Sequence, residues 1–217
     1  SSMYPKHAPE GRLGNWDGAA RDAMLRYQMT HGLPRTYDAT DERTLAQMCQ
    51  RRCGHPDNIY GVAQQVMKWR KTNLTWKVIN QTGDVPDNYV SAAFNAGYAG
   101  WSGCTPLTFT EVLANQDADI TIVFKRLDTK GQVLAQAWFP EDGRMEFDDS
   151  EDWSWVLPIG RGQVDLATVV MHEAGHLIGL EHSTVRGAQM APVYAGPKRF
   201  LEQDDIARAQ SIYGAKP

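Results

Sequence analysis

The chain has 217 residues, a length that suits one well-cored domain with a small accessory domain. Its 22 basic and 26 acidic residues are mixed along the sequence and give a formal net charge of -4, which argues against a binding surface for nucleic acid or for anionic membrane. No apolar run approaches the roughly 18 residues of a membrane span, and the start Ser1-Ser2-Met3 lacks a basic and then apolar signal. We therefore expect a mature end from which any signal was removed.

Helical patterns open the chain. Two helix-like stretches are predicted at residues 18–30 and 41–51, joined by the turn-rich sequence His31-Gly32-Leu33-Pro34. Few structural signals follow between residues 59 and 65. We therefore predict a helical domain over residues 1–58, a linker over 59–68 and a larger domain over 69–217.

Short strands and helices alternate in the larger domain. Pro86 opens a predicted helix that runs to residue 96. The β-rich runs that follow predict strands at residues 119–124, 133–139 and 145–148. Asp165 is the predicted cap of a helix with an apolar face, and a last helix is expected over 201–213. This order predicts an α+β fold, a twisted mixed sheet with a helix packed beneath it.

The sequence His172-Glu173-Ala174-Gly175-His176-Leu177-Ile178-Gly179-Leu180-Glu181-His182 predicts a catalytic zinc site. Residues four apart lie on one face of a helix, so His172 and His176 can point at one ion with Glu173 beside them. Gly179 can end the helix in the left-handed conformation and turn the chain back, which brings His182 in as third ligand. Three protein ligands leave the fourth zinc position open for water, and Glu173 is placed to act as its general base.

A pair of structural histidines beside an unrelated glutamate is the alternative to this zinc site. That alternative suits a bare H-E-x-x-H. Here Gly179 and His182 complete H-E-x-x-H-x-x-G-x-x-H, the metzincin pattern of zinc peptidases. We therefore prefer the catalytic interpretation.

Three cysteines, Cys49, Cys53 and Cys104, are an odd number, so at least one is a free thiol or a metal ligand. Cys53 lies in Arg51-Arg52-Cys53-Gly54-His55-Pro56-Asp57, which resembles the cysteine-switch sequence P-R-C-G-x-P-D of matrix metalloproteinases (matrixins), with Arg51 in place of the first proline. The resemblance implies that the Cys53 thiolate occupies the fourth zinc position and displaces the catalytic water, and that Arg52 pairs with Asp57. Thiolate is a strong zinc ligand, and an inert buried thiol would not explain the Gly-Pro-Asp context. A pairing of Cys49 with Cys104 stays open.

The resemblance extends over almost the whole chain. Trp101-Ser102-Gly103-Cys104-Thr105-Pro106-Leu107-Thr108-Phe109 is similar to the matrixin sequence W-S-x-V-T-P-L-T-F. Gln189-Met190-Ala191-Pro192-Val193-Tyr194 is similar to the family's Met-turn, where Met190 would lie under the zinc as a polarisable floor. Asp204-Asp205 is similar to the family's paired aspartates, one of which is expected to meet the new N-terminus after activation. The implied fold is a metzincin-type catalytic domain preceded by a small all-α prodomain.

The resemblance also implies how a substrate lies. Leu134 and Ala135 occupy the place of the family's edge strand, against which an extended peptide binds antiparallel. Thr168, Pro192 and Tyr194 would line the pocket for the side chain after the scissile bond, which should be hydrophobic. The depth of that pocket stays open.

One region departs from the family. The usual long loop is shortened to residues 125–132, and Gln136 and Glu146 stand where the family has histidines. We therefore predict one zinc per chain, with residues 125–132 as a plain hairpin connection. Asp148 and Glu151 match calcium-binding carboxylates, but the loop that completes that site has gone, so the calcium content stays open.

These observations predict a secreted zinc-dependent endopeptidase in latent proenzyme form, which cuts internal bonds of extended polypeptides. Its partners would be the polypeptide substrate and its own prodomain, and we expect a monomer. The alternative is a non-catalytic cell-wall or protein-binding module that keeps a metzincin-like metal fold; such a module would be free to lose Glu173. An intracellular redox protein using Cys49 and Cys53 is disfavoured, because C-x-x-x-C lacks thioredoxin spacing. The sequons at Asn73 and Asn80 do not identify the host.

Overall fold

The computed structural model describes residues 18–36, 41–57 and 67–217. The chain divides into two compact units, Ser1–Gln50 with Pro56–Val62 and Arg51–His55 with Ala63–Pro217. The cysteine-containing segment 51–55 therefore clusters with the larger unit. The predicted linker over residues 59–68 lies mostly outside the described residues. None of the described helices is both long and apolar enough to cross a membrane.

The smaller unit contains two helices, α1 (Gly18–Thr30) and α2 (Glu42–Met48). Asp41 caps α2, since its carboxylate accepts hydrogen bonds from the Thr44 backbone N–H at 2.9 Å and from its hydroxyl at 2.7 Å. The fully buried Gln28 of α1 donates to the Thr44 hydroxyl at 3.1 Å and joins the two helices. The prediction that the second helix reaches residue 51 was wrong, because the chain after Met48 turns and becomes a strand of the larger unit.

A six-stranded sheet forms one layer of the larger unit, in the order β1-β5-β6-β4-β2-β3. Its strands are β1 (Arg52–Cys53), β2 (Asn73–Val78), β3 (Thr108–Glu111), β4 (Ile120–Lys125), β5 (Val133–Ala137) and β6 (Arg144–Asp148). All neighbouring pairs are parallel except β5 and β6. A separate parallel pair is formed by β7 (Trp153–Ser154) and β8 (Val164–Asp165). The predicted strands are confirmed, with ends that differ by one or two residues.

The connection from β4 to β5 corrects one prediction. Residues 125–132 were expected to form a plain hairpin, but β6 lies between β4 and β5 in the sheet. The connection therefore crosses the end of β6, where the Asp128 backbone N–H donates to the Asp148 carboxylate at 3.1 Å. β5 is antiparallel to β6 and pairs on its other side with β1, the strand at that edge of the sheet.

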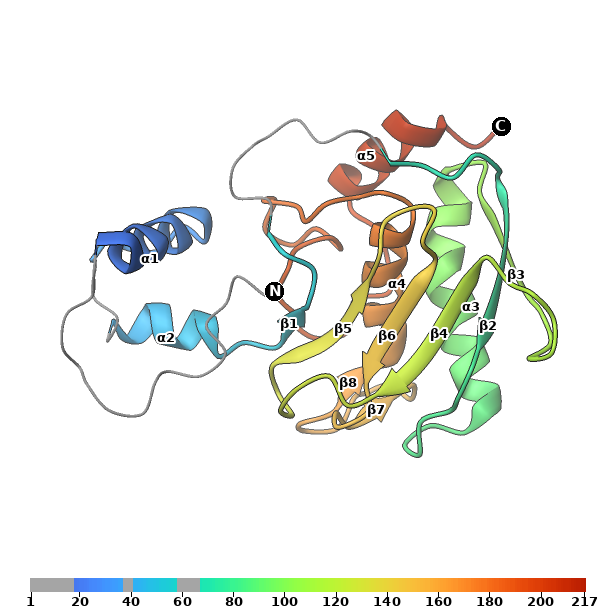
Figure 1. Cartoon of the computed structure of the whole chain (residues 1–217), viewed down its shortest axis with the longest axis horizontal. Helices are drawn as coiled ribbons and strands as arrows, with labels where there is room; N and C mark the ends of the chain where they lie inside the picture. The colour runs from blue at the N-terminus through green and yellow to red at the C-terminus, as the bar shows by residue number, and fades with distance from the viewer. Residues whose placement is uncertain (1–17, 37–40, 58–66) are drawn as a thin grey trace. The chain divides into compact units, whose positions relative to one another are not determined.

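Two helices, α3 (Asp87–Cys104) and α4 (Leu166–Leu177), lie behind the sheet in Figure 1. The predicted helix over 86–96 was too short, because α3 continues for another two turns along α4. Gly97 permits this approach, since a Cβ there would lie 2.5 Å from the Val170 side chain. The third helix, α5 (Gln203–Tyr213), ends the fold close to its predicted bounds.

Aromatic side chains fill the space between the sheet and α3. The Trp76 ring lies 5.6 Å from Phe94, Phe94 lies 5.4 Å from Phe147, and Phe147 lies 5.6 Å from Trp153, measured between ring centroids. All four side chains are buried. Replacing one such core aromatic by alanine typically costs about 3–5 kcal/mol of unfolding free energy. This packing gives α4 a rigid support.

Candidate metal centre

The start of α4 is fixed by Asp165. Its fully buried carboxylate accepts from the Thr168 backbone N–H at 3.2 Å and forms two contacts with the Arg199 guanidinium, at 3.0 and 2.5 Å. A cap that is also paired with arginine holds the first turn in place. Asp165 was predicted as the cap, whereas Arg199 was not recognised from the sequence.

The end of α4 is a Schellman turn. Ile178 is the C-cap, and Gly179 follows with φ 96°. The Gly179 N–H donates to the His176 carbonyl and the Leu180 N–H donates to the Gly175 carbonyl, both at 2.9 Å. These are the two bonds of that motif, and the left-handed residue suits glycine. The turn reverses the chain and brings His182 back to the helix.

Four predicted ligands converge at this point. The Cys53 sulfur and one ring nitrogen each of His172, His176 and His182 all lie within 4.8 Å of one another. A tetrahedral zinc ion, with bonds of about 2.0–2.3 Å to His and Cys donors, fits inside a group of this size. Among the described residues, this is the one group of three or more Cys, His or carboxylate donors that could hold a metal ion.

Two histidines have their ring orientation fixed by carbonyl groups. The His172 Nδ1 lies 2.7 Å from the Gln189 carbonyl, and the His176 Nδ1 lies 2.6 Å from the Leu180 carbonyl. A carbonyl can only accept, so each Nδ1 carries the proton and each Nε2 keeps a lone pair. Both Nε2 atoms are buried, and within the described part of the chain neither has a hydrogen-bond partner. A bound zinc ion would satisfy both.

The ionisation of these residues also fits a metal. Burial lowers the pKa of His172 to about 3 and that of His176 well below its usual value, so both rings are neutral ligands at neutral pH. Burial, and then the Glu173 carboxylate, raises the pKa of the Cys53 thiol well above its usual value. A Cys53 thiolate therefore requires a cation close to it, and zinc supplies that charge.

Glu173 lies on α4 between the two helical histidines and is fully buried. Burial raises its pKa to about 8. A carboxyl with this pKa is poised to exchange a proton near neutral pH. The position predicted for a general base thus has the electrostatic character that the role needs.

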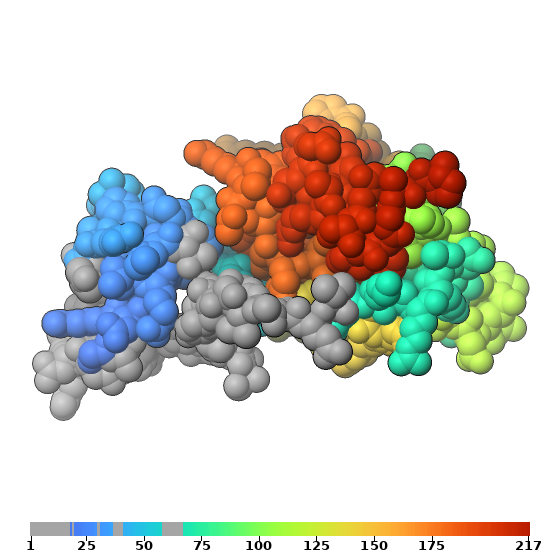
Figure 2. Space-filling view, turned by 90° about the horizontal axis from the view of Figure 1, so that it is seen from above, coloured from blue at the N-terminus to red at the C-terminus, as the bar shows by residue number. Residues whose placement is uncertain are grey.

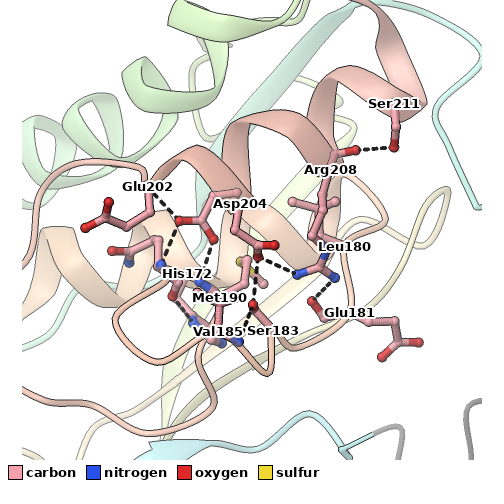
Figure 3. Close-up of polar contacts among 12 residues, drawn as sticks. His172, Leu180, Glu181, Ser183, Val185, Met190, Glu202, Asp204, Arg208 and Ser211 are labelled. Carbon is pink, nitrogen blue, oxygen red and sulfur yellow. Dashed lines mark hydrogen bonds and ion pairs between the residues drawn. The ribbon is translucent and has the colours of Figure 1, made fainter.

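The Met-turn lies beneath the histidines and is held by α5. Met190 is fully buried, and its side chain packs against Gly175, leaving no room for a Cβ at that position. The buried Asp205 accepts from the Gln189 and Met190 N–H groups at 2.7 and 3.0 Å, and Asp204 accepts from the Ser183 hydroxyl at 2.7 Å. Figure 3 shows these contacts, and in Figure 2 the C-terminal residues (red) adjoin the orange residues that precede them in the chain.

The segment that carries Cys53 is hydrogen-bonded on both sides. On one side, Arg52 donates to the Gln132 carbonyl at 2.9 Å and Gly54 donates to the Ala135 carbonyl at 2.8 Å. On the other side, Cys53 donates to the Pro192 carbonyl at 3.0 Å, and Tyr194 donates to the Arg51 carbonyl at 2.9 Å. Residues 51–54 therefore fill the space between β5 and the strip 192–194 as an added strand, parallel to β5.

Side chains on both flanks of Cys53 contact the larger unit. The Arg51 guanidinium lies 3.4 Å from the fully buried Glu151 carboxylate. The His55 ring stacks on His176 at 4.2 Å, and its Nε2 lies 3.4 Å from the Glu181 carboxylate. In the sequence, Arg51 was noted only because it replaces the first proline of the cysteine-switch sequence. Its contact with Glu151 was therefore not predicted. The expected pairing of Arg52 with Asp57 stays a prediction.

A cavity of about 100 Å³ opens beside the histidines. Among the predicted substrate-binding residues, Leu134, Thr168, Pro192 and Tyr194 line it, together with Cys53, His172 and Glu173. Ala135 is outside this lining and offers its carbonyl to Gly54 instead. The Tyr194 hydroxyl accepts from the Asp165 N–H at 2.9 Å, which ties the pocket wall to the start of α4.

Where the resembled family has histidines, this chain has a hydrogen-bonded network. Gln136 donates to the Glu146 carboxylate at 2.8 Å, and the Lys125 ammonium contacts the same carboxylate at 2.6 Å. The ammonium group supplies the positive charge that balances Glu146. Cys49, Cys53 and Cys104 are free thiols in this structure.

Comparison with known proteins places this site in a family. Residues 68–214, more than half of the chain, match Peptidase_M10, described as Matrixin. The chain belongs to the matrixin family. Matrix metalloproteinase-C of Caenorhabditis elegans is 34% identical over 99% of this chain and 41% of its own length. Matrix metalloproteinase-19 of Homo sapiens is 36% identical over 90% of this chain and 40% of its own length. Stromelysin-2 of Rattus norvegicus is 36% identical over 82% of this chain and 40% of its own length.

The chain spans about two fifths of the length of these curated relatives. The match covers the strands β2 to β8, α4 and the Met-turn, so the α+β fold predicted for the larger domain is confirmed as that of a matrixin domain. Family membership supports a zinc-dependent metalloendopeptidase.

Proposed function

We propose that the protein is a zinc-dependent endopeptidase held latent by its own residues 51–54. The observation that carries the proposal is the position of the Cys53 sulfur within 4.8 Å of the three histidine nitrogens. Residues 1–58 would form the inhibitory prodomain, residues 59–68 the activation linker and residues 69–217 the catalytic domain. We also propose that it acts as a monomer outside the cell, since its relatives are named for the matrix.

The chemistry rests on a small set of groups. His172, His176 and His182 would hold the zinc, which supplies an electrophile for a peptide carbonyl and a water of pKa about 7 when bound. Glu173 would take the proton of that water and pass it to the leaving amine. Its place on α4 beside His172 and His176 suits this role. Met190 would support the site from below.

The contacts of residues 51–54 indicate what a substrate would use. Once this segment leaves, the Gln132, Ala135 and Pro192 carbonyls and the Tyr194 N–H lose their partners. An extended polypeptide can restore these main-chain bonds between β5 and the strip 192–194. The adjoining pocket, with Thr168, Pro192 and Tyr194 in its wall, would accept a hydrophobic side chain. This arrangement supports internal cleavage of extended chains.

Cleavage of denatured collagen and casein by the Cys53→Ala variant tests the proposal. We expect turnover that a zinc chelator abolishes and added zinc restores. The double variant Cys53→Ala/Glu173→Ala should keep its zinc and lose about 10²- to 10⁴-fold in rate, the usual worth of general-base assistance. A zinc-loaded Cys53→Ala protein without any turnover would favour the alternative, a binding module.

A comparison of the unsubstituted chain with Cys53→Ala tests latency separately. The unsubstituted chain should stay intact, whereas the variant should cut its own linker between Asp57 and Lys68 during purification. An intact variant that nevertheless cleaves casein would remove the switch from the proposal and leave the peptidase.

A further inference from the structure

One side chain of α5 reaches the chain next to the third histidine. The Arg208 guanidinium donates to the Glu181 carbonyl at 2.7 Å, and its other terminal nitrogen lies 3.7 Å from the Asp204 carboxylate (Figure 3). Arg208 is half-buried, and neither the zinc motif nor the Met-turn includes it. Its contact with Glu181 lies one residue before His182.

The Glu181 carbonyl belongs to the peptide unit that leads into His182. A peptide unit is planar, so a bond to its oxygen fixes the direction in which the chain enters the next residue. His172 and His176 have their backbones fixed within α4, whereas His182 follows the turn at Gly179. On the far side of His182, Asp204 holds the Ser183 hydroxyl at 2.7 Å. Arg208 and Asp204 thus form hydrogen bonds to the residues on both sides of His182.

We infer that Arg208 is a positioning residue for His182 and through it sets the zinc affinity of the site. This inference rests on the proposed zinc ligation by His182. Residues that orient a metal ligand typically contribute about 10- to 100-fold to metal affinity. The Arg208→Met variant should therefore weaken zinc binding by about this factor while keeping the aliphatic part of the side chain.

Zinc competition with a chromophoric chelator on the full-length chain tests the inference. Arg208→Met should release zinc at lower chelator concentration, Arg208→Lys should recover part of the affinity, and the cobalt-substituted Arg208→Met protein should show an altered visible spectrum. Ile212→Ala is the matched control, because Ile212 packs on the hydrophobic core from the same helix. It should lower the melting temperature and leave zinc affinity unchanged.

The inference is overturned if Arg208→Met binds zinc as tightly as the unsubstituted chain. It is also overturned if Arg208→Met and Ile212→Ala have the same melting temperature and Arg208→Met loses no more zinc affinity than Ile212→Ala. In both cases His182→Ala should still lose zinc, which keeps the proposed function intact. If His182→Ala binds zinc as well as the unsubstituted chain, the proposed zinc site itself fails.

A second inference concerns the two sequons, Asn73-Leu74-Thr75 and Asn80-Gln81-Thr82. Asn80 forms a two-point contact with one residue of β4: its Nδ2 donates to the Phe124 carbonyl at 2.7 Å, and its Oδ1 accepts from the Phe124 N–H at 3.1 Å. In this pair of hydrogen bonds, the Nδ2 hydrogen of Asn80 that bonds to Phe124 is the one on the same side of the amide as Oδ1. Asn73 differs, because its Oδ1 accepts from the Thr108 hydroxyl at 3.0 Å, and its Nδ2 donates no hydrogen bond within the described residues.

Attachment of a sugar to asparagine creates a secondary amide, which prefers the trans form. In that form the sugar carbon occupies the position on the same side as Oδ1. A glycan on Asn80 would therefore replace the hydrogen that bonds to Phe124 and separate the chain from β4. A glycan on Asn73 changes only the exposed Nδ2 and keeps the bond to Thr108.

We propose that Asn73 is an N-glycosylation site and that Asn80 stays unmodified in the folded protein. The oligosaccharide would come from a lipid diphosphate donor in a secretory pathway, so this assignment rests on the proposed secretion of the protein. The bond from the sugar to the diphosphate breaks, the bond from the sugar to Nδ2 forms, and Nδ2 loses one proton. Modification of Asn80 on the unfolded chain would yield protein in which Asn80 cannot form its two-point contact with Phe124 of β4.

Secretion of the full-length chain from animal cells behind a signal peptide tests this assignment. Release of the glycan by peptide N-glycosidase in ¹⁸O-water marks each modified asparagine directly. We expect the label on Asn73 only, and we expect Asn73→Gln, but not Asn80→Gln, to remove the glycan mass. Label on Asn80 in the secreted folded protein, or no label at all, would overturn the proposal.

Discussion

Single glycines decide how closely the parts of the metal centre approach one another. Gly179 has a positive φ of 96°, and a Cβ at this position would also collide with the Met67 carbonyl. The φ of Gly54 lies outside the left-handed region, but a Cβ there would lie 2.9 Å from the Val133 side chain. The first glycine forms the turn that carries His182. The second lets residues 51–54 lie flat against β5.

The substitution Gly179→Ala should destabilise the fold more than Gly162→Ala. Both glycines have a positive φ, 96° and 85°, so both variants lose about 1–2 kcal/mol of unfolding free energy from backbone strain. Gly162 has open space around its Cα, whereas Gly179 meets the Met67 carbonyl. Denaturant unfolding measures the difference, and zinc affinity should fall only in Gly179→Ala. Equal losses in the two variants would contradict this role of the turn.

At the scale of elements, the sequence predicted what depends on local patterns. The helix α4, its cap at Asp165, the turn at Gly179 and the strands β4, β5 and β6 follow from spacing, capping and alternation. The length of α3 depends on how Gly97 meets Val170, and the place of β6 between β4 and β5 depends on pairing across the sheet. These partners lie far apart along the chain, so local patterns could not predict them.

The added strand β1 is strengthened by one ion pair outside its backbone bonds. We expect Arg51→Ala to expose Cys53 more often, because it leaves the buried Glu151 carboxylate without the guanidinium at 3.4 Å. The rate at which Cys53 reacts with an alkylating reagent should rise several-fold. Arg70→Ala is the control, since Arg70 is 90% exposed and its pair with Glu141 is a surface contact. A rate unchanged in Arg51→Ala would show that this pair does not hold the segment.

The connection between β4 and β5 should make stability depend on pH. Burial, together with the nearby Asp148 and Glu151 carboxylates, raises the pKa of Asp128 to about 6. The folded state therefore binds the Asp128 proton more tightly than the unfolded state, so stability present below pH 4 is lost as the pH rises to about 6. In calcium-free buffer, Asp128→Asn should melt at a higher temperature than the unsubstituted chain at pH 7 and show no such gain at pH 4. The same gain at both pH values would rule out ionisation as the cause.

At the scale of the whole molecule, the number of tightly bound metal ions follows from the donors that the fold brings together. The cluster at Cys53 is the one candidate among the described residues, and Gln136 and Glu146 are already bonded to each other. Metal analysis of the full chain after dialysis without chelator should give one zinc per chain. Substitution of His176 by alanine should bring the content close to zero. Two zinc ions per chain would show that a second site forms elsewhere.

The network of Lys125, Glu146 and Gln136 bears on the order in which the protein is assembled. The positive charge in this network belongs to the Lys125 side chain and not to a metal ion. The contacts among β4, β6 and β5 therefore form as soon as these strands pair. The sheet and the helices behind it can therefore complete refolding from denaturant in metal-free buffer. Zinc then enters a framework that is already built, and an apoprotein made this way should regain its metal without unfolding again.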